Sequence, residues 1–333
     1  MSRLRWGVLG VARIATSKVI PAMQRSAATE VVAIGSRDLA KAERAAADLG
    51  IPRAYGSYEA VLSDPAVEAV YIPLPNHLHA PWTRRAALAG KHVLCEKPIG
   101  LDAGEARSLL DVRDRTGVRI QEAFMVRFHP QWTATLDLVR AGDLGDVRAM
   151  TGIFSYFNDD PANIRNVAAY GGGALMDIGC YFVMTSRLVL GREPARVLAM
   201  MERDPAFGTD RMTSVILDFG GATFAGTCAT QTAPAQRVQI VGTRGRVEIE
   251  VPFNAAAGAP AWYVLERPSG GAERRSTVPC DQYTLQGDAF AGAVRGGLSP
   301  YPLEESIGNM RVIDALVRSA ADGRWVPLGK DVR

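Results

Sequence analysis

The 333-residue sequence predicts an α/β protein: an N-terminal doubly wound parallel sheet, followed by an α+β domain with an open, mostly antiparallel sheet. Through the first third, short apolar segments alternate with helix-like segments, as parallel β-α-β crossovers require. Beyond residue 190 the strand-like segments are separated by glycines, which is typical of neighbouring antiparallel strands. We therefore expect two domains, residues 1–123 and 124–333, with a C-terminal helix able to pack back toward the first.

The elements of the first domain follow one another at the spacing of repeated β-α-β units. Asp102 stands at the N-cap position of one helix, where its carboxylate can accept a hydrogen bond from the first turn. Strands are expected at 3–9, 30–35, 69–72, 92–95 and 120–123, and helices at 14–26, 39–49, 78–89 and 102–116.

The second domain begins with a helix and one long strand, and then becomes rich in strands. The glycine run Gly171–Gly173 opens a helix, and breaks at Gly220–Gly221 and Gly242–Gly245 mark tight connections. Helices are expected at 130–141, 175–190, 285–295 and 303–322, and strands at 146–156, 195–203, 211–219, 222–229, 237–241, 245–251 and 263–266.

Composition places the chain among globular proteins of average polarity. Hydrophobic residues make up 47% and charged residues 22%, and the formal net charge is only +3. Such a small charge gives no reason to expect nucleic acid or an anionic membrane as partner. No apolar run approaches the length that a membrane-spanning helix needs, so no membrane partner is expected.

The cysteines and the first residues bear on the compartment. Residues 1–10 are patterned like a buried strand and lack the regions of a signal peptide. The cysteines show no C-x-x-C spacing, which favours buried free thiols over disulfides or a zinc site. They are Cys95, Cys180, Cys228 and Cys280. We therefore expect a cytoplasmic protein without a metal site.

A glycine loop between the first strand and the first helix predicts a dinucleotide site. Gly10-Val-Ala12-Arg-Ile-Ala15 follows the G-x-G-x-x-G/A pattern except that alanine replaces the second glycine. An ordinary strand-helix turn explains these residues almost as well when they are taken alone. Their position decides, because the helix that follows aims its N-terminus at the place where pyrophosphate binds in a Rossmann domain.

The end of the second strand favours NADP over NAD. An NAD site usually has a carboxylate there for the ribose hydroxyls, whereas a 2′-phosphate calls for a cation and a hydroxyl. This position carries Ser36 and Arg37, and the one acid, Asp38, falls just past it. The alternative is a solvated surface arginine.

Two further segments resemble a known family. One comprises Pro73-Leu-Pro-Asn-His-Leu-His79 and Ala89-Gly-Lys-His-Val-Leu-Cys-Glu-Lys-Pro98, and the other is Gly171-Gly-Gly-Ala-Leu-Met-Asp-Ile-Gly-Cys-Tyr181. Together they resemble the glucose–fructose oxidoreductase/inositol dehydrogenase (Gfo/Idh/MocA) family. The likeness is greater to its branch of NADP-dependent D-xylose 1-dehydrogenases and dimeric dihydrodiol dehydrogenases. It runs from Leu4 to about Pro327.

The resemblance implies roles for matching positions. Lys97 would face the reacting carbon beside the nicotinamide, and Pro98 would follow a cis peptide bond. Asp177 and Tyr181 match the family's carboxylate and acid/base tyrosine, where other branches carry histidine in place of the tyrosine. Two departures are Ala12 in the glycine loop and Val126, where this branch often has tyrosine.

The residues themselves support the same chemistry. Asp177 and Tyr181 are four apart in an expected helix, so both side chains emerge on one face. Oxidising a carbinol needs a base, and a free tyrosine, with a pKa of about 10, is too weakly acidic to act as one near neutral pH. A nearby ammonium such as Lys97 favours the phenolate, and two units of pKa correspond to roughly 2.7 kcal/mol. Taken singly, each residue is more often structural.

The remaining site residues surround these. We expect cofactor contacts from the strand-end loops and from two arginines of the second domain, and a substrate wall that includes Phe157 along with Lys97, Asp177 and Tyr181. The expected cofactor-binding residues are Gly10, Ala12, Arg13, Ile14, Ser36, Arg37, Leu74, Pro75, Asn76, His79, Glu96, Lys97, Arg127 and Arg165.

The sequence thus predicts an NADP-dependent oxidoreductase that moves hydride between nicotinamide and a carbinol carbon, with the substrate a monosaccharide or cyclic diol. We expect oxidation of an aldose resembling D-xylose or D-glucose to its lactone, with Lys97, Asp177 and Tyr181 meeting around the nicotinamide. The alternatives are an aldose–aldose or aldose–ketose oxidoreductase with tightly bound NADP, a trans-dihydrodiol dehydrogenase, and a non-catalytic sensor of NADP or sugar. Because an open sheet needs its face covered, we expect a homodimer or homotetramer.

Overall fold

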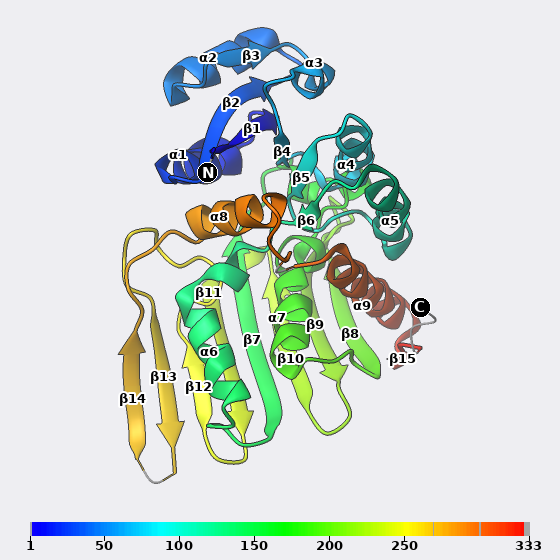
Figure 1. Ribbon diagram of the computed structural model, residues 1–333. Coiled ribbons are helices and arrows are strands. Elements are labelled where there is room, and N and C mark those ends of the chain that lie inside the picture. Colours follow the sequence, from blue (N-terminus) through cyan, green and yellow to red (C-terminus); the bar gives the residue numbers. More distant parts are fainter. Residues whose placement is uncertain (1, 269, 300, 330–333) are drawn as a thin grey trace. The chain divides into compact units, whose positions relative to one another are not determined.

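The computed structural model describes residues 2–268, 270–299 and 301–329, which form two compact units (Figure 1). The first unit contains the chain up to Met125 together with Asp281–Ile307. The second contains Val126–Cys280 and the residues from Gly308 onward. The first division thus falls two residues after the expected boundary at residue 123, and the chain returns to the first unit near its C-terminal end.

The first unit is built on a six-stranded, all-parallel sheet. Its strand order is β3-β2-β1-β4-β5-β6, which confirms the predicted doubly wound class. The strands are β1 (Leu4–Leu9), β2 (Thr29–Gly35), β3 (Arg53–Tyr55), β4 (Ala69–Ile72), β5 (His92–Cys95) and β6 (Ile120–Glu122).

Helices on both faces of this sheet begin at side-chain caps where the sequence provides them. Asp38, Ser57 and Asp102 each accept a hydrogen bond from the backbone N–H three residues later, as N-caps do. The helices are η1 (Ala15–Val19, a π-helical turn), α1 (Ile20–Arg25), α2 (Leu39–Leu49), α3 (Tyr58–Ser63), η2 (Asn76–Leu78), α4 (His79–Leu88), α5 (Ala103–Thr116) and α8 (Gln282–Val294).

The core of the first unit explains why α8 belongs to it. Trp6 on β1 is fully buried, and its ring centroid lies 5.0 Å from that of Phe290 on α8. Thr284 also donates a 3.0 Å hydrogen bond to the carbonyl of Ala22 on α1. The expected second domain, residues 124–333, included this helix, with a C-terminal helix able to pack back toward the first domain; an apolar pattern alone does not reveal which helix does so.

The second unit is built on a nine-stranded sheet in the order β14-β13-β12-β11-β7-β10-β9-β8-β15. All neighbouring pairs are antiparallel except β7 with β10, so the sheet is mostly antiparallel as predicted. The strands are β7 (Val147–Phe157), β8 (Arg196–Arg203), β9 (Asp210–Asp218), β10 (Thr223–Ala229), β11 (Gln231–Gly242), β12 (Arg246–Ile249), β13 (Trp262–Arg267), β14 (Gly271–Ser276) and β15 (Val326–Pro327).

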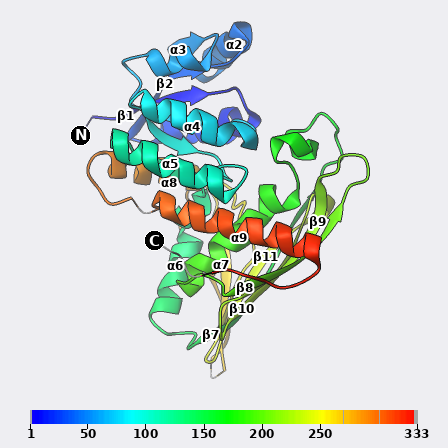
Figure 2. The same ribbon diagram turned by 90° about the vertical axis from the view of Figure 1, so that its right-hand side faces the viewer.

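Helices cover one face of this second sheet. They are α6 (Pro130–Arg140), η6 (Leu175–Gly179, π-helical), α7 (Cys180–Leu190) and the part of α9 (Leu303–Asp322) from Gly308 onward. Figure 2 shows α6, α7 and α9 on the same side of the strands. Phe182 on α7 packs on Phe224 of β10 with ring centroids 5.3 Å apart, and both side chains are fully buried.

The other face of the second sheet carries a mixed row of side chains. Cross-strand pairing aligns Arg237, Ile153, Thr227, Ser214 and Met200 across β11, β7, β10, β9 and β8. Cross-strand partners share a face of a sheet, so these side chains form one row. Ile153 is 41% exposed and Met200 is 76% exposed, which leaves apolar surface on this face.

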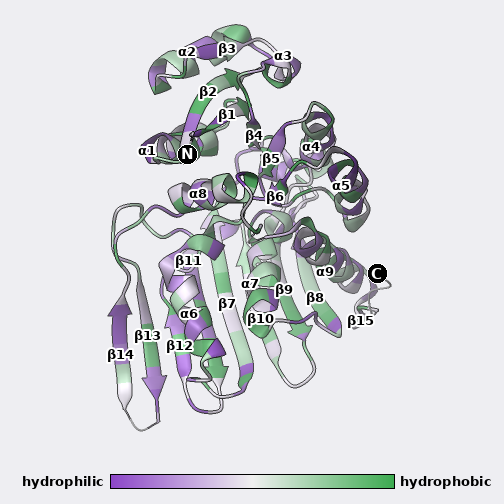
Figure 3. Cartoon of the chain, in the orientation of Figure 1, coloured by the Kyte–Doolittle hydropathy of each residue, from purple (hydrophilic) through white to green (hydrophobic). Residues whose placement is uncertain are grey.

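The sequence analysis missed short or polar elements. β3 has three half-buried residues, and α3 has only six, so neither gives a periodic pattern. β14 has the sequence GAERRS, is coloured hydrophilic in Figure 3, and was also missed. The two-residue β15 is too short to carry a pattern at all.

One helical stretch corrects the expectation that no segment is long and apolar enough for a membrane. Residues Ala168–Leu190 meet that test by length and composition. However, 83% of the apolar window is buried inside the protein, as in a core helix. The stretch includes η6 and α7, and their packing against β7 and β10 accounts for its hydropathy.

Candidate functional site

The first unit forms a glycine loop at the carboxyl end of β1. Gly10 has φ of 120°, and its N–H donates a 2.8 Å hydrogen bond to the carbonyl of Gly35 at the end of β2. A Cβ atom at Gly10 would lie 3.1 Å from the Leu74 side chain and would force a backbone conformation that other residues rarely adopt. The loop therefore keeps a tight turn and an open backbone surface, which suits a pyrophosphate.

The helix that follows the glycine loop begins with backbone N–H groups directed toward the backbone surface of that loop. Arg13 and Ile14 form its first helical residues, ahead of the π-helical turn of η1. The carbonyl of Ala12 accepts the Thr16 N–H at 3.0 Å, so Ala12 fills the second-glycine position without breaking the helix start. A helix N-terminus of this kind favours an anion.

Strand order gathers the expected cofactor residues at one sheet edge. The order reverses between β1 and β4, and ligands of such sheets bind outside the carboxyl ends at that point. Gly10 follows β1, Ser36 follows β2, Leu74 follows β4 and Glu96 follows β5. With the adjoining Pro75 and Lys97, these residues fit a dinucleotide.

The acid after β2 has a structural role. The Asp38 carboxylate accepts the Lys41 N–H at 3.2 Å as the N-cap of α2. The Ser36 hydroxyl, which is largely buried, accepts the Asp38 N–H at 3.2 Å, and Arg37 is exposed beside it. The strand end therefore carries a largely buried hydroxyl and an exposed guanidinium.

A buried carboxylate holds the loop that carries Lys97. The Lys97–Pro98 peptide bond is cis, which confirms that expectation. Just beyond it, the Ile99 N–H donates a 2.9 Å hydrogen bond to Glu122, whose other oxygen accepts the Tyr301 hydroxyl at 3.0 Å. Sequence reasoning missed Glu122, although an acid at the end of a buried strand was a signal.

Glu96 is also bonded within the first unit. One of its carboxylate oxygens accepts the Tyr71 hydroxyl from β4 at 2.6 Å, and the other lies 3.4 Å from the Lys97 backbone N–H. Burial raises the pKa of Tyr71 well above its usual value, and the Glu96 charge raises it further. Tyr71 therefore remains a donor and fixes the orientation of Glu96.

His79 links two strand-end loops. One ring nitrogen lies 2.6 Å from the Leu74 carbonyl oxygen and the other 2.6 Å from that of Pro98, and the side chain is fully enclosed. Burial lowers the pKa of His79 to about 4, and the charge of Lys97 lowers it as well. The neutral ring donates to only one of these two carbonyls and packs between the loops around Leu74 and Lys97; its expected cofactor contact stays a prediction. Asn76 lies in η2 of the same segment.

In the second unit, Asp177 joins an ion pair and a hydrogen bond. Its Oδ2 accepts the Tyr156 hydroxyl from β7 at 2.6 Å and lies 2.8 Å from Nε of Arg165. Burial is the main cause that raises the pKa of Tyr156 well above its usual value, and the charge of Asp177 adds to it. Arg165, expected at the cofactor, thus has a partner within its own unit.

Tyr181 lies in an aromatic cluster on the same face of β7. Its ring centroid is 5.8 Å from that of Phe154 and 5.2 Å from that of Phe253, and the side chain is 4% exposed. Phe154 and Tyr156 are two residues apart on β7, so they share a face. Asp177 and Tyr181 both pack there, as their four-residue spacing predicts.

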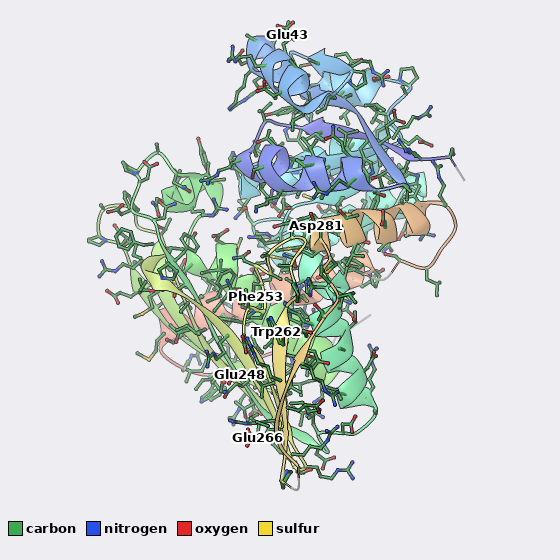
Figure 4. All side chains as sticks on the ribbon, turned by 90° about the vertical axis from the view of Figure 1, so that its left-hand side faces the viewer. Glu43, Glu248, Phe253, Trp262, Glu266 and Asp281 are labelled. Carbon is green, nitrogen blue, oxygen red and sulfur yellow. The ribbon has the colours of Figure 1, made fainter. Side chains whose placement is uncertain are left out.

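Phe253 is a second residue that the sequence did not reveal. It lies in the loop between β12 and β13 and is labelled in Figure 4. Its N–H donates to the Gln236 side chain at 3.0 Å, and the neighbouring Pro252 carbonyl accepts the Trp132 indole N–H at 2.7 Å. These bonds fix Phe253 against Tyr181, and no sequence pattern marks such a loop residue.

The glycine run before η6 is shaped by two neighbours. A Cβ at Gly172 would overlap the Arg165 carbonyl, and one at Gly173, which has φ of 113°, would overlap the Asp210 carboxylate. Asp210 accepts the Leu175 N–H at 2.7 Å, and the Arg165 carbonyl accepts the Gly173 N–H at 2.8 Å. The run thus fixes where the helix bearing Asp177 begins.

Of two further expected residues, Phe157 lies away from this cluster. Phe157 is 62% exposed and, by strand alternation, lies on the opposite face of β7 from Phe154 and Tyr156. Arg127 is half-buried, with Nη1 3.9 Å from the Met184 sulfur. Within residues 2–268, 270–299 and 301–329, no three His, Cys, Asp or Glu side chains are arranged to hold a metal ion.

The doubly wound sheet with its glycine loop is typical of a dinucleotide-binding protein, and comparison with known proteins gives the family. Residues 4–124 match the oxidoreductase family with an NAD-binding Rossmann fold, and residues 132–248 match the GFO/IDH/MocA C-terminal domain. The chain belongs to the Gfo/Idh/MocA oxidoreductase family, whose members use NAD(P).

Relatives extend over nearly the whole chain. An uncharacterized oxidoreductase of Rhizobium meliloti is 50% identical, with 98% of this chain and 99% of that protein covered. A D-xylose 1-dehydrogenase (NADP(+)) of Haloferax volcanii is 42% identical, with 98% and 100% covered. The crystal structure of an aldose-aldose oxidoreductase from Caulobacter crescentus has a TM-score of 0.91 at 29% identity, with 98% and 100% covered.

Proposed function

We propose that this oxidoreductase uses NADP to oxidise the anomeric carbinol of an aldose to a lactone, with D-xylose or D-glucose as model substrates. The carrying observation is that Asp177 on η6 and Tyr181 on α7 contact the same face of β7, through Tyr156 and Phe154, and that Tyr156 and Arg165 hold the carboxylate. A carboxylate and a tyrosine that contact the same strand face supply the groups that proton transfer needs. The D-xylose dehydrogenase likeness supports an aldose as substrate.

The proposed chemistry assigns one task to each side chain. Tyr181 takes the proton of the anomeric hydroxyl as the C1–H bond breaks and the C1=O bond of the lactone forms. Lys97, with its ammonium, stabilises the phenolate form of Tyr181 and the oxygen of the reacting carbon. Asp177 orients the sugar hydroxyls. When bound, the nicotinamide ring accepts the hydride from C1.

The choice of NADP depends on the end of β2. Ser36 and Arg37 supply a hydroxyl and a cation there, while the Asp38 carboxylate is already engaged as the N-cap of α2. An NAD site would use such a carboxylate for the ribose hydroxyls. We infer that the backbone of the glycine loop and of Leu74 and Pro75 binds the pyrophosphate and nicotinamide ribose.

A cofactor-linked turnover screen tests the proposal. Initial rates are measured with NADP and with NAD over common aldoses, ketoses and dihydrodiols. The proposal predicts turnover with aldoses and a kcat/KM at least about tenfold higher with NADP, since one phosphate contact from arginine is worth at least 1.4 kcal/mol. Turnover with a dihydrodiol alone, or with NAD alone, contradicts it.

The likeness to the aldose-aldose oxidoreductase favours a second candidate. In that reaction NADP stays bound and passes hydride from one sugar to another. Near-ultraviolet absorbance of reduced nicotinamide in the purified protein, changing on addition of a sugar without added NADP, distinguishes this from a dehydrogenase. Binding of NADP without any turnover would instead indicate a sensor.

We also propose that the protein is a cytoplasmic homodimer or homotetramer packed through the open face of its second sheet. Ile153, Phe157 and Met200 expose apolar side chains among polar ones on that face. Such a face is characteristic of an interface. Cys95, Cys180 and Cys228 are buried free thiols, which suits a reducing compartment.

A further inference from the structure

A buried loop residue lies at the centre of the aromatic cluster that encloses Tyr181. The ring of Phe253, which follows β12, has its centroid 4.7 Å from that of Phe154 on β7, with the two planes 22° apart. It also lies 5.2 Å from the Tyr181 ring and 6.4 Å from that of Trp132 on α6. Phe253 is fully buried, although loops usually run over the surface of a protein. Its position therefore depends on support from the neighbouring elements.

The helix α6 supports this loop from one side. The Gln131 amide nitrogen donates hydrogen bonds to two successive carbonyls, that of Val251 at 2.9 Å and that of Pro252 at 3.2 Å. The Trp132 indole donates a further one, of 2.7 Å, to Pro252. Gln131 is fully buried, and in the part of the chain that the structure describes its amide oxygen has no hydrogen-bond partner. The hydrogen bonds of this side chain are thus those that it makes to the loop.

Gln236 of β11 supports the loop from the other side. Its side-chain oxygen accepts the N–H groups of both Phe253 and Asn254, each at 3.0 Å. Gln236 pairs with Phe154 across β11 and β7, so the two side chains share a face of the sheet. The same glutamine therefore lies beside Phe154 and fixes the backbone of the residue whose ring stacks on Phe154.

We propose that Gln236 is a positioning residue for proton transfer, acting through Phe253 on the phenol ring of Tyr181. The inference rests on the proposed function, in which Tyr181 takes the substrate proton. A phenol enclosed by other rings can turn only where those rings leave room, so the Phe253 ring limits the directions open to the Tyr181 hydroxyl. Proton transfer requires a hydrogen-bonded geometry, and a displacement of about 1 Å can cost about a hundredfold in rate.

Steady-state kinetics of the full chain, with NADP and the best aldose of the turnover screen, test this. Gln236→Met keeps the approximate shape of the side chain but lacks a strong acceptor for the two N–H groups. It should lower kcat about tenfold or more and change the KM for the aldose less than about threefold, because the base acts in the transition state. A role in packing alone predicts a lower thermal midpoint without this difference between kcat and KM.

Gln236→Glu is the conservative variant. Its carboxylate oxygen can accept both N–H groups, so it should retain kcat within about threefold at its own optimum pH. Gln231→Met is the matched control, because Gln231 is the first residue of the same strand and its amide bonds Asp204 at 2.8 Å. This control should keep the kcat of the unmodified protein.

Phe253→Leu tests the next residue of the same path. Leucine removes the ring and leaves the two backbone N–H groups in place, so this variant should lower kcat to a similar extent. The variant that combines Gln236→Met with Phe253→Leu should lose little more than Phe253→Leu alone, since two residues that act along one path are not additive.

The outcomes separate this inference from the proposed function. A normal kcat in Gln236→Met, while Tyr181→Phe is inactive, would overturn the inference alone. So would additive losses in the double variant, or equal losses in Gln236→Met and Gln236→Glu. If Gln236→Met fails to fold, a normal kcat in Phe253→Leu would overturn it instead. An active Tyr181→Phe enzyme, or an unmodified protein that turns over no aldose, would overturn the proposed function and this inference with it.

Discussion

At the scale of single residues, Asp177 owes its geometry to Tyr156 and Arg165, which both bond the same carboxylate oxygen. A carboxylate fixed in this way orients a hydroxyl without having to reorganise, which is how a polar site accelerates a reaction.

Asp177→Asn should therefore lower kcat by about 100-fold, the size of a proton-transfer or orienting contribution, with little change in the thermal midpoint. The amide keeps the shape but loses the charge that pairs with Arg165. Steady-state kinetics with an aldose and NADP measure the effect, and calorimetry with NADP controls for cofactor binding. A kcat within threefold of the unmodified enzyme contradicts the assignment.

The lowered pKa of His79 predicts how the stability of the fold depends on pH. Its pKa is lowered to about 4 in the folded chain, against about 6.5 in an unfolded one, so the folded form binds fewer protons between these values. The contribution of His79 to the free energy of unfolding is fully present above pH 6.5. It is lost as pH drops toward 4, by up to about 3 kcal/mol. Urea unfolding of the unmodified protein and of His79→Gln across this range measures it. The difference between the two slopes should vanish if His79 does not titrate there.

At the scale of elements, the sequence predicted the strands and helices that alternate regularly and the residues that form a motif. Alternating strands and helices indicated the parallel sheet, and the spacing from Asp177 to Tyr181 indicated a shared face. β3 and α3 escaped prediction because they are short and only partly apolar. Glu122 and Asp210 were also missed, since their partners, Ile99 and Leu175, are far away in the sequence.

The role of the glycine run Gly171–Gly173 before η6 can be tested by adding one methyl group at Gly173. Gly173→Ala would have to adopt a positive φ and displace the Asp210 carboxylate, so it should cost about 1–3 kcal/mol of stability and lower kcat by shifting Asp177. Gly191→Ala is the control. It has φ of 63° at the end of the same helix with nothing within 4 Å of its Cβ, so it should lose stability but keep its kcat. Equal kcat values in both variants would contradict the role of the run.

At the scale of the whole molecule, the residues that the sequence predicts for catalysis are divided between the two compact units. Lys97 and the glycine loop belong to the first, and Asp177 and Tyr181 to the second. The sequence predicted that a C-terminal helix could pack back toward the first domain, but it did not indicate that the returning segment is Asp281–Ile307, because an apolar helix face does not specify its partner.

The open sheet face gives a prediction about assembly. Ile153→Lys replaces an exposed apolar side chain of the mixed row on that face with a charge, and burial of an unpaired charge should weaken association about tenfold or more. Leu88→Lys on α4, at a position 57% exposed in the first unit, is the control and should leave assembly unchanged. Light scattering over a range of concentrations measures both. A monomeric unmodified protein at micromolar concentration contradicts the proposal.

The most direct measurement compares NADP reduction by the unmodified enzyme and by Tyr181→Phe, with D-xylose as substrate and pH varied. We predict turnover by the unmodified enzyme that rises with pH, and a loss of about 100-fold or more in the variant, because phenylalanine cannot take the hydroxyl proton. Tyr263→Phe, a buried tyrosine of the same unit, should retain its rate. A Tyr181→Phe enzyme with nearly full activity and an unchanged pH profile would contradict the account.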